Sequence, residues 1–182
     1  MLCAGYRADQ LETMLADLSQ GAELPLDLVI EPHPLGTGGA LLNALQQHPT
    51  DESYLVLNAD TYLTHDAFRL RSDGVDSVIL GVEAADRARF GSLRVADDGY
   101  VLELLEKGET GPGLVSAGVY CFTPAAMAGE QPRLCSMELD LLPALIARGE
   151  LRAATYAGSF VDIGTPEALA AFKASSDRSA QQ

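Results

Sequence analysis

The chain has 182 residues, of which 47% are hydrophobic and 21% charged, and its formal net charge is −14 at pH 7. This length suffices for one sizeable core, and the composition is that of a globular rather than a disordered protein. The acidic balance disfavours nucleic acids and anionic membranes as partners, because proteins bind both through basic patches.

The cysteines and histidines do not have the spacing of a metal site or a disulfide framework. Cys3, Cys121 and Cys135 are odd in number and far apart, without a CxxC pair, which favours buried thiols in a reducing compartment. No apolar run is long enough to span a membrane, and the first residues do not resemble a signal peptide. We therefore expect a soluble protein of the cytoplasm.

The first half of the chain predicts alternating strands and helices. In chain order, the expected elements are a helix over 8–18, a strand over 26–32, a glycine turn and helix over 36–48 with Thr37 as N-cap, a strand over 54–58, a short helix over 65–71 and a strand over 76–82. This alternation is typical of a parallel sheet with crossover helices.

The second half predicts a different arrangement. In chain order, it contains a hairpin within 91–108 that turns at Asp97-Asp98-Gly99, a strand over 114–122, a helix over 138–150 despite Pro143, one or two strands over 151–164 and a helix over 165–175 capped by Thr165. There is no repeat and no internal linker. We expect one mixed α/β domain over 1–175, followed by a frayed polar tail over 176–182.

The stretch EPHPLGTGGAL, residues 31–41, is a candidate ligand-binding turn. Gly36, Gly38 and Gly39 would let the backbone approach a flat or anionic ligand closely, and the following helix would offer free N–H groups. The alternative is a plain helix-entry turn, and a glycine-rich turn alone does not decide between the two.

Charged residues follow three strand-like segments. Asp60 follows YLVLNA, Glu106 and Lys107 follow VLELL, and Asp162 lies between FV and IGTPE. Each has an ordinary explanation as a turn residue, an exposed charged pair or an acceptor for N–H groups of the helix near Thr165. If Asp60 and Asp162 converge, however, they form a hard-oxygen site suited to Mg²⁺, which usually takes further ligands from phosphates.

Six stretches follow one another along the chain: EPHPLGTGGAL, VLNADTYL, FGSLRVADDGYVLELLEKG, GLVSAGVYCF, SMELDLLPAL and FVDIGTPEAL. In this order they resemble the sugar-1-phosphate nucleotidyltransferases, most closely the branch with heptose- and mannose-1-phosphate guanylyltransferases. The resemblance implies a Rossmann-like mixed α/β fold of nucleotide-diphospho-sugar transferase type, with a mainly parallel sheet flanked by helices. It also implies transfer of a nucleotidyl group from an NTP, with GTP favoured, to a sugar 1-phosphate, with Mg²⁺ as cofactor and release of pyrophosphate.

The resemblance also implies roles for individual residues. Asp60 and Asp162 would be the Mg²⁺ ligands, and Lys107 would contact the sugar phosphate. The nucleotide would be bound by Glu31, Pro34, Gly36, Thr37 and Asn58. The sugar would be bound by Gly91, Glu106, Ser116 and Gly118, although related enzymes more often have Asn where this chain has Ser116.

The start of the chain departs from the family pattern. Members of the family open with a strand and a GxGTRL loop that grips the triphosphate, whereas this chain begins MLCAGYRADQ, where Arg7 belongs to a different element. We therefore expect an N-terminally shortened member that, alone, binds NTP weakly and turns over slowly or not at all. The lack of an inner strand would leave unpaired backbone groups and apolar surface, so we also expect self-association into a homo-oligomer.

Two other functions stay open from the sequence alone. One is a non-catalytic sugar-phosphate-binding or interaction module, derived from the family and without the triphosphate loop. The other is a metal-dependent glycosyltransferase, which also uses a strand-end Asp, although that class does not typically carry EKG, SAGVY and VDIGTPE in this order. The motifs do not decide which base and which sugar are used.

Overall fold

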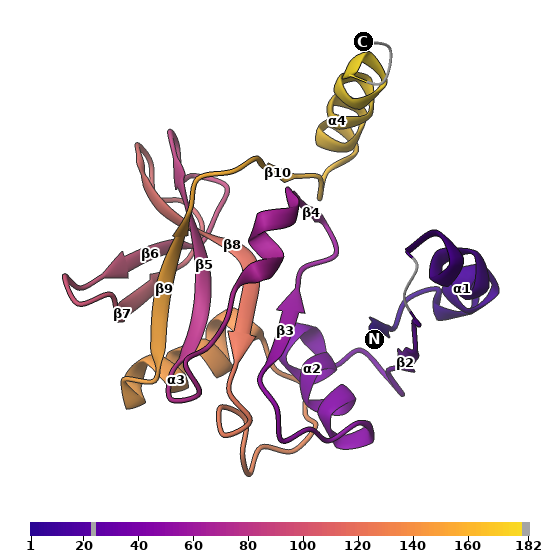
Figure 1. Ribbon diagram of the computed structural model, residues 1–182, viewed down its shortest axis with the longest axis horizontal. Coiled ribbons are helices and arrows are strands. Elements are labelled where there is room, and N and C mark those ends of the chain that lie inside the picture. Colours follow the sequence, from indigo (N-terminus) through magenta and orange to yellow (C-terminus); the bar gives the residue numbers. More distant parts are fainter. Residues whose placement is uncertain (23–24, 180–182) are drawn as a thin grey trace. The chain divides into compact units, whose positions relative to one another are not determined.

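The computed structural model describes residues 1–22 and 25–179 and consists of two compact units. The first unit comprises Met1–Asp51 and Met127–Ala144, and the second comprises Glu52–Ala126 and Leu145–Gln182. Figure 1 shows the helices and strands of both units and labels those for which there is room. The single domain expected over 1–175 stays a prediction.

The first unit contains a small parallel sheet and helices. In chain order, its elements are β1 (Leu2–Ala4), α1 (Ala8–Ala22), β2 (Leu28–Ile30), α2 (Gly36–Gln47), the π-helix η2 (Met137–Leu141) and the start of α3 (Leu142–Arg148). β1 and β2 pair in parallel, with Leu2 opposite Leu28 and Ala4 opposite Ile30. Because α1 connects them, this part of the chain has a strand–helix–strand arrangement, of which the sequence predicted the helix and the second strand.

The second unit is built on a six-stranded sheet. In chain order, its elements are β3 (Tyr54–Leu57), β4 (Thr61–Leu63), the 3-10 helix η1 (His65–Arg69), β5 (Ser77–Ala84), β6 (Ser92–Val95), β7 (Val101–Leu105), β8 (Gly113–Phe122), β9 (Leu151–Tyr156), β10 (Phe160–Asp162) and α4 (Pro166–Ser179). Strands β7, β6, β8, β5 and β9 are neighbours in that order, and β3 also pairs with β8. The long strands β9, β5 and β8 lie side by side in Figure 1.

The mixed α/β class is confirmed, but parallel pairing is less extensive than expected. Among the described residues, β1 with β2 and β5 with β9 pair in parallel. The pairings of β8 with β3, β5 and β6, of β6 with β7 and of β4 with β10 are antiparallel. A pattern of alternating strands and helices predicts crossovers in the first half of the chain, but it does not predict the direction in which the later strand β8 runs.

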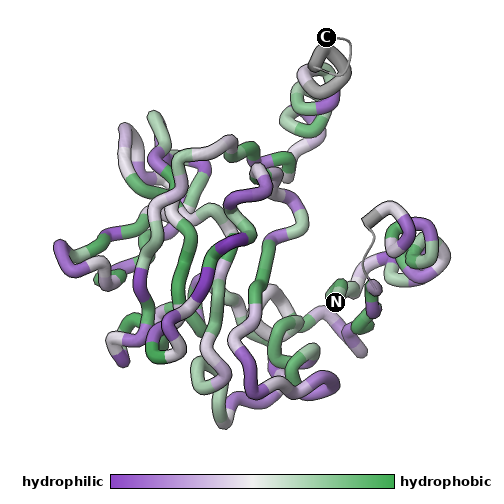
Figure 2. The backbone as a smooth tube through the Cα atoms, in the orientation of Figure 1, coloured by the Kyte–Doolittle hydropathy of each residue, from purple (hydrophilic) through white to green (hydrophobic). Residues whose placement is uncertain are grey.

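A core cluster of the second unit gathers around β5 and β8. Its buried members are Leu63, Ala67, Leu70, Leu80, Val82, Val115, Ala117, Val119, Cys121 and Tyr156. The members from β8 alternate along the strand, because successive side chains of a strand point to opposite faces. In Figure 2 hydrophobic residues follow the strands, whereas the turn between β6 and β7 is hydrophilic.

Two predicted local structures are confirmed. β6 and β7 form the hairpin expected at Asp97-Asp98-Gly99, which the Ala96 N–H closes by donating to the Tyr100 carbonyl at 2.9 Å. α4 begins at Pro166, and the Thr165 Oγ1 caps it by accepting the Ala168 N–H at 3.2 Å.

Other local expectations are corrected. Thr37 is not the N-cap of α2, because the helix begins at Gly36 and its N-cap is Leu35. Cys3 is exposed rather than buried, although all three cysteines are free, as expected. Strand β4 was not expected, since three residues between a turn and a helix carry little periodicity.

The end of the chain also differs from the expectation. α4 continues to Ser179, so it extends into the expected frayed tail, of which residues 180–182 lie outside the described residues. Within the part of the chain that the structure describes, no helix has both the length and the apolar character to cross a bilayer.

Replacement of Leu80 by alanine is expected to destabilise the second unit. Leu80 is 4% exposed within the core cluster, so L80A leaves a cavity and should lower the free energy of unfolding by about 2–5 kcal/mol. The matched control is L102A, because Leu102 is 56% exposed and its loss should change stability by less than about 0.5 kcal/mol. Urea unfolding of the two variants tests this, and equal midpoints would contradict it.

Candidate functional site

A short antiparallel ribbon places two carboxylates next to each other. β4 pairs with β10 so that Asp162 lies opposite Thr61. Beyond that pair, the Ile163 N–H donates to the Asp60 carbonyl at 2.8 Å. Asp60 and Asp162, which are far apart in the sequence, are therefore neighbours across the β4–β10 ribbon.

Gly164 keeps a space open between the two carboxylates. A Cβ built on Gly164 would lie 2.9 Å from Asp60 Oδ2 and 3.0 Å from Asp162 Oδ1. These two oxygens are therefore no farther apart than the sum of those distances. The Gly164 N–H donates to Asp162 Oδ1 at 2.8 Å, which orients that carboxylate. Any larger residue at position 164 would fill the space that both oxygens face.

The two carboxylates fit a divalent cation that also binds phosphate. Mg²⁺ commonly uses one or two protein carboxylates and completes its shell with water and substrate phosphates. Among the residues that the structure describes, no group of three or more His, Cys, Asp or Glu could hold a metal ion. Asp60 and Asp162 thus match an ion shared with a substrate rather than one enclosed by protein.

Arg89 forms an ion pair with one of the two carboxylates. Its Nη2 lies 3.0 Å from Asp162 Oδ2, and the side chains of Arg89 and Asp162 are 56% and 23% exposed. In the described part of the chain, no other ion pair involves Asp60 or Asp162. Sequence reasoning missed Arg89, which directly precedes the motif that begins at Phe90-Gly91.

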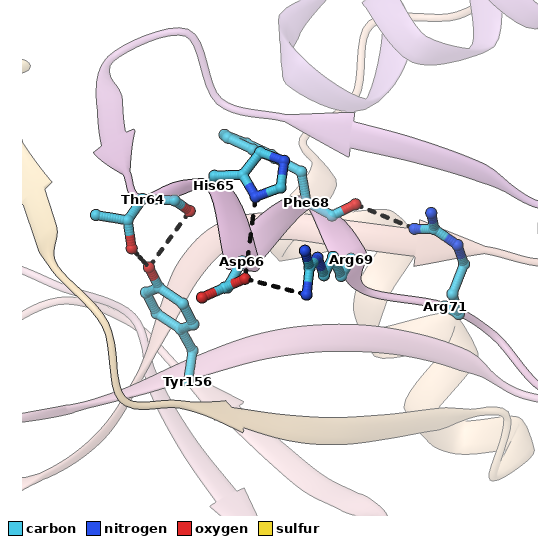
Figure 3. A network of polar contacts seen from close by, with 7 residues as sticks. All are labelled: Thr64, His65, Asp66, Phe68, Arg69, Arg71 and Tyr156. Atoms are coloured by element: carbon cyan, nitrogen blue, oxygen red, sulfur yellow. Dashed lines mark hydrogen bonds and ion pairs between the residues drawn. The ribbon is translucent and has the colours of Figure 1, made fainter.

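The opposite end of the β4–β10 ribbon is closed by Tyr156, the last residue of β9. Its hydroxyl forms a hydrogen bond with the Thr64 hydroxyl and donates to the Thr64 carbonyl at 3.4 Å. Figure 3 shows Tyr156 reaching Thr64 just before η1, within which Asp66 and Arg69 pair at 3.5 Å. Thr64 follows β4 and Tyr156 precedes β10. Their contact therefore connects the same two segments of the chain that the ribbon joins. Neither residue carried a sequence signal.

Four predicted residues form a continuous chain of contacts beside β8. The Asn58 N–H donates to the Gly118 carbonyl at 2.8 Å, and the Ser116 N–H donates to the Gly91 carbonyl at 2.9 Å. Between them, the Gly118 N–H donates to Ser116 Oγ at 3.3 Å. Gly118 has a φ of +68°, and a Cβ there would lie 2.6 Å from Asn58 Nδ2, so the close approach requires glycine.

Glu106 and Lys107 lie in the turn after β7, and both are exposed. The next residue, Gly108, donates its N–H to the Ala88 carbonyl at 3.0 Å. This bond ties their turn to the loop that carries Arg89.

The first-unit candidates lie at the start of α2. Glu31 Oε2 accepts the Leu35 N–H at 2.8 Å, which fixes the turn that contains the exposed Pro34. Gly36 has a φ of +73°, and a Cβ there would lie 2.6 Å from the Cys135 carbonyl oxygen. Glycine is therefore required at position 36 by the backbone that faces it.

The Thr37 hydroxyl is already engaged within the first unit. It accepts the Met137 N–H at 2.8 Å and donates to Glu138 Oε2 at 3.2 Å. This side chain therefore ties α2 to η2.

The sequence left open whether the helix that follows the glycine turn offers free N–H groups to a ligand. Gly38 and Gly39 of α2 do not. The N–H groups of Gly38 and Gly39 both donate to the Cys135 carbonyl, at 3.1 and 3.2 Å, and both residues are buried. A Cβ on Gly38 would lie 3.0 Å from the Cys135 sulfur. Burial raises the pKa of that thiol, so it stays uncharged at neutral pH. Gly38 and Gly39 serve close packing.

A cavity of about 660 Å³ adjoins Asp162 in the second unit. Its lining includes Glu83, Asp86, Arg89, Phe90, Phe160 and Asp162, together with residues of α4. The rings of Phe90 and Phe160 are 5.3 Å apart and supply its aromatic wall. Of the residues predicted from sequence, Asp162 alone is among those that line this cavity in the described part of the chain.

Comparison with known proteins shows the family to which this chain belongs. The family described as "Nucleotidyl transferase" matches residues 1–178. The chain is 33% identical to mannose-1-phosphate guanylyltransferase of Mycobacterium tuberculosis over 162 residues, covering 84% of this chain and 45% of that protein. It is 29% identical to the mannose-1-phosphate guanylyltransferase catalytic subunit beta of Drosophila pseudoobscura pseudoobscura over 175 residues. This match covers 92% of this chain and 47% of that protein.

A solved structure resembles the chain in both fold and sequence. HddC from Yersinia pseudotuberculosis, complexed with GMP-PN, superposes with a TM-score of 0.77 at 33% identity. The match covers 92% of this chain and 73% of that one. The chain therefore belongs to the nucleotidyl transferase family, as the six motifs predicted. It spans about half the length of the curated relatives it matches.

Replacement of Gly118 by alanine is expected to disturb Asn58. The left-handed backbone alone should cost about 1–2 kcal/mol of unfolding free energy, and the clash with Asn58 should add to it. G74A is the matched control, because Gly74 has a φ of +88° but no atom within 4 Å of a built Cβ. Chemical unfolding should show a larger loss for G118A than for G74A. Equal losses would mean that Asn58 moves away at no cost.

Replacement of Tyr156 by phenylalanine is expected to loosen the β4–β10 ribbon. Y156F removes the hydroxyl bonded to Thr64 and should lower the free energy of unfolding by about 0.5–1.5 kcal/mol. Y62F is the control, because Tyr62 lies on the same ribbon with its side chain exposed. Thermal or urea unfolding measures both, and a Y156F variant as stable as Y62F would contradict the expectation.

Proposed function

We propose that this chain carries the transfer centre of a sugar-1-phosphate nucleotidyltransferase, with GTP as the nucleotide donor. The observation that carries the proposal is the convergence of Asp60 and Asp162 on the space beside Gly164. Family membership supports the reaction class, and the names of the guanylyltransferase relatives support GTP and mannose 1-phosphate. A heptose 1-phosphate is the second candidate, from the motif resemblance alone.

The reaction joins two phosphates without a protein nucleophile. A phosphate oxygen of the sugar 1-phosphate attacks the α-phosphorus of the NTP, and the bond from that phosphorus to the oxygen bridging it to the β-phosphate breaks. The products are an NDP-sugar and pyrophosphate. The protein accordingly contributes orientation and charge compensation rather than covalent chemistry.

The carboxylate pair is proposed to hold Mg²⁺. When bound, the ion would offset charge on the reacting phosphates. Asp60 and Asp162 are suited to this because the β4–β10 register places their backbones side by side, and the Gly164 N–H orients the carboxylate of Asp162 before any ligand arrives.

The remaining roles are proposed from the motif resemblance, for each unit by itself. Lys107 is proposed to bind the sugar phosphate, and the sugar hydroxyls are proposed to contact Gly91, Glu106, Ser116 and Gly118. In the first unit, Glu31, Pro34 and Gly36 are proposed nucleotide-binding residues. In the second unit, Asn58 is proposed as one. We leave the hydroxyl of Thr37 out of this set, because Met137 and Glu138 already occupy it.

The reaction is proposed to take place in the cytoplasm. Three free cysteines, one of them exposed, suit a reducing compartment.

Replacement of either aspartate by asparagine is expected to abolish most transfer. Purified protein in excess over labelled GTP, with Mg²⁺ and mannose 1-phosphate or heptose 1-phosphate, should form GDP-sugar and pyrophosphate in a single turnover. D60N and D162N should each slow this by about 100-fold or more, because the carboxylate pair loses charge. D97N, in the exposed β6–β7 turn, should retain the unmodified rate.

Two results would contradict the proposal. One is the absence of an NDP-sugar with every NTP tested, from protein that is folded. The other is transfer by D60N and D162N at the rate of D97N. Release of free NDP instead of pyrophosphate would indicate a glycosyltransferase.

A further inference from the structure

Arg89 forms an ion pair with Asp162, one of the two carboxylates at the proposed transfer centre. Asp162 Oδ1 accepts the Gly164 N–H at 2.8 Å, and Asp162 Oδ2 accepts Arg89 Nη2 at 3.0 Å. Both oxygens of Asp162 are thus engaged, whereas Asp60 Oδ2 faces the space beside Gly164 from the other side. A cation that binds both aspartates must compete with the guanidinium for negative charge.

The loop that carries Arg89 is fixed, but its side chain is not enclosed. The Phe90 N–H donates to the Arg87 carbonyl at 2.8 Å, and the Gly108 N–H donates to the Ala88 carbonyl at 3.0 Å. The Arg89 side chain itself is 56% exposed and lines the cavity beside Asp162. A long, exposed side chain on a fixed loop can exchange one partner for another without movement of the backbone.

The second partner available to Arg89 is a phosphate. The bond from Gly108 to Ala88 holds the turn of Lys107 against the loop of Arg89, so two cationic residues belong to adjoining backbone segments. Guanidinium binds phosphate through paired N–H groups and stays charged at all physiological pH values.

We propose that Arg89 is the counter-ion of Asp162 before metal binds, and that a divalent cation displaces it toward the phosphate of the sugar 1-phosphate. The first half of this inference concerns metal binding by the free protein. The second half rests on the proposed function. Arg89 thereby couples occupation of the carboxylate pair to recognition of the sugar phosphate.

The first test measures the affinity of the protein for Mn²⁺ in the absence of nucleotide. Electron paramagnetic resonance of the free ion reports how much Mn²⁺ stays unbound. R89Q should bind Mn²⁺ about two- to fivefold more tightly than the unmodified protein, as expected for loss of an exposed competing ion pair. R89K, which retains the charge, should bind with nearly unmodified affinity. R94Q is the matched control, because Arg94 pairs with Glu103 at 2.8 Å on the β6–β7 hairpin and its loss changes net charge equally.

The second test is the KM for the sugar 1-phosphate at saturating Mg²⁺. R89Q should raise this KM about tenfold with kcat less affected, because a charged hydrogen bond to the phosphate is lost. R89K should restore part of the affinity, and R94Q should leave KM unchanged. In the unmodified protein, the side-chain ¹⁵N signal of Arg89 should shift on Mg²⁺ addition while that of Arg94 does not.

The outcomes separate this inference from the proposed function. Three results would overturn the displacement of Arg89 by a cation. They are equal Mn²⁺ affinity for R89Q and R94Q, no Mn²⁺ binding in any variant, and an Arg89 ¹⁵N signal that does not shift when Mg²⁺ is added. An unchanged KM in R89Q would overturn the phosphate contact while transfer itself stands. Tighter Mn²⁺ binding by R89Q in a protein that forms no NDP-sugar would support the displacement and refute the proposed function.

Discussion

The antiparallel pairing of β4 with β10 is the constraint on which the candidate site depends. It brings Asp162 opposite Thr61 and thereby sets Asp60 beside Asp162, two residues that no local segment could hold together. The backbone bond from Ile163 to Asp60 and the contact of Tyr156 with Thr64 secure the two ends of the ribbon. A carboxylate pair needs such a frame, because like charges held close together repel each other unless a cation offsets them.

Strand β8 gives the second unit both its core and its predicted sugar contacts. Val115, Ala117 and Val119 enter the core cluster, whereas Ser116 and Gly118 alternate with them and join the contacts to Gly91 and Asn58. Packing on one face of the strand thereby fixes the position of the polar residues on the other face. A substitution in the core can accordingly alter the site without any direct contact with a substrate.

The sequence predicted those elements whose hydrogen bonds join residues close together along the chain. The β6–β7 turn at Asp97-Asp98-Gly99 and the cap of α4 at Thr165 are short patterns with their own hydrogen bonds, and both are present. The aspartates of the ribbon were singled out because each ends a strand-like segment, and the motif resemblance implied that both bind Mg²⁺. Their pairing depends on register, which no short pattern encodes. Arg89 was missed for the same reason, since its partner Asp162 belongs to a distant segment. The role of the glycines after Gly36 stayed open because a glycine required for packing looks the same in sequence as one required by a ligand.

The separation of β4 and β10 along the chain has a consequence for assembly. An N-terminal fragment that ends before β10 contains Asp60 but lacks its partner, so the carboxylate pair forms only after long-range closure of the second unit. Closing such a long loop costs entropy that local turns do not incur. An ion that binds the closed pair and not the open chain shifts that equilibrium by mass action. Affinity for such an ion would thus also measure the fraction of the chain in which the second unit is closed.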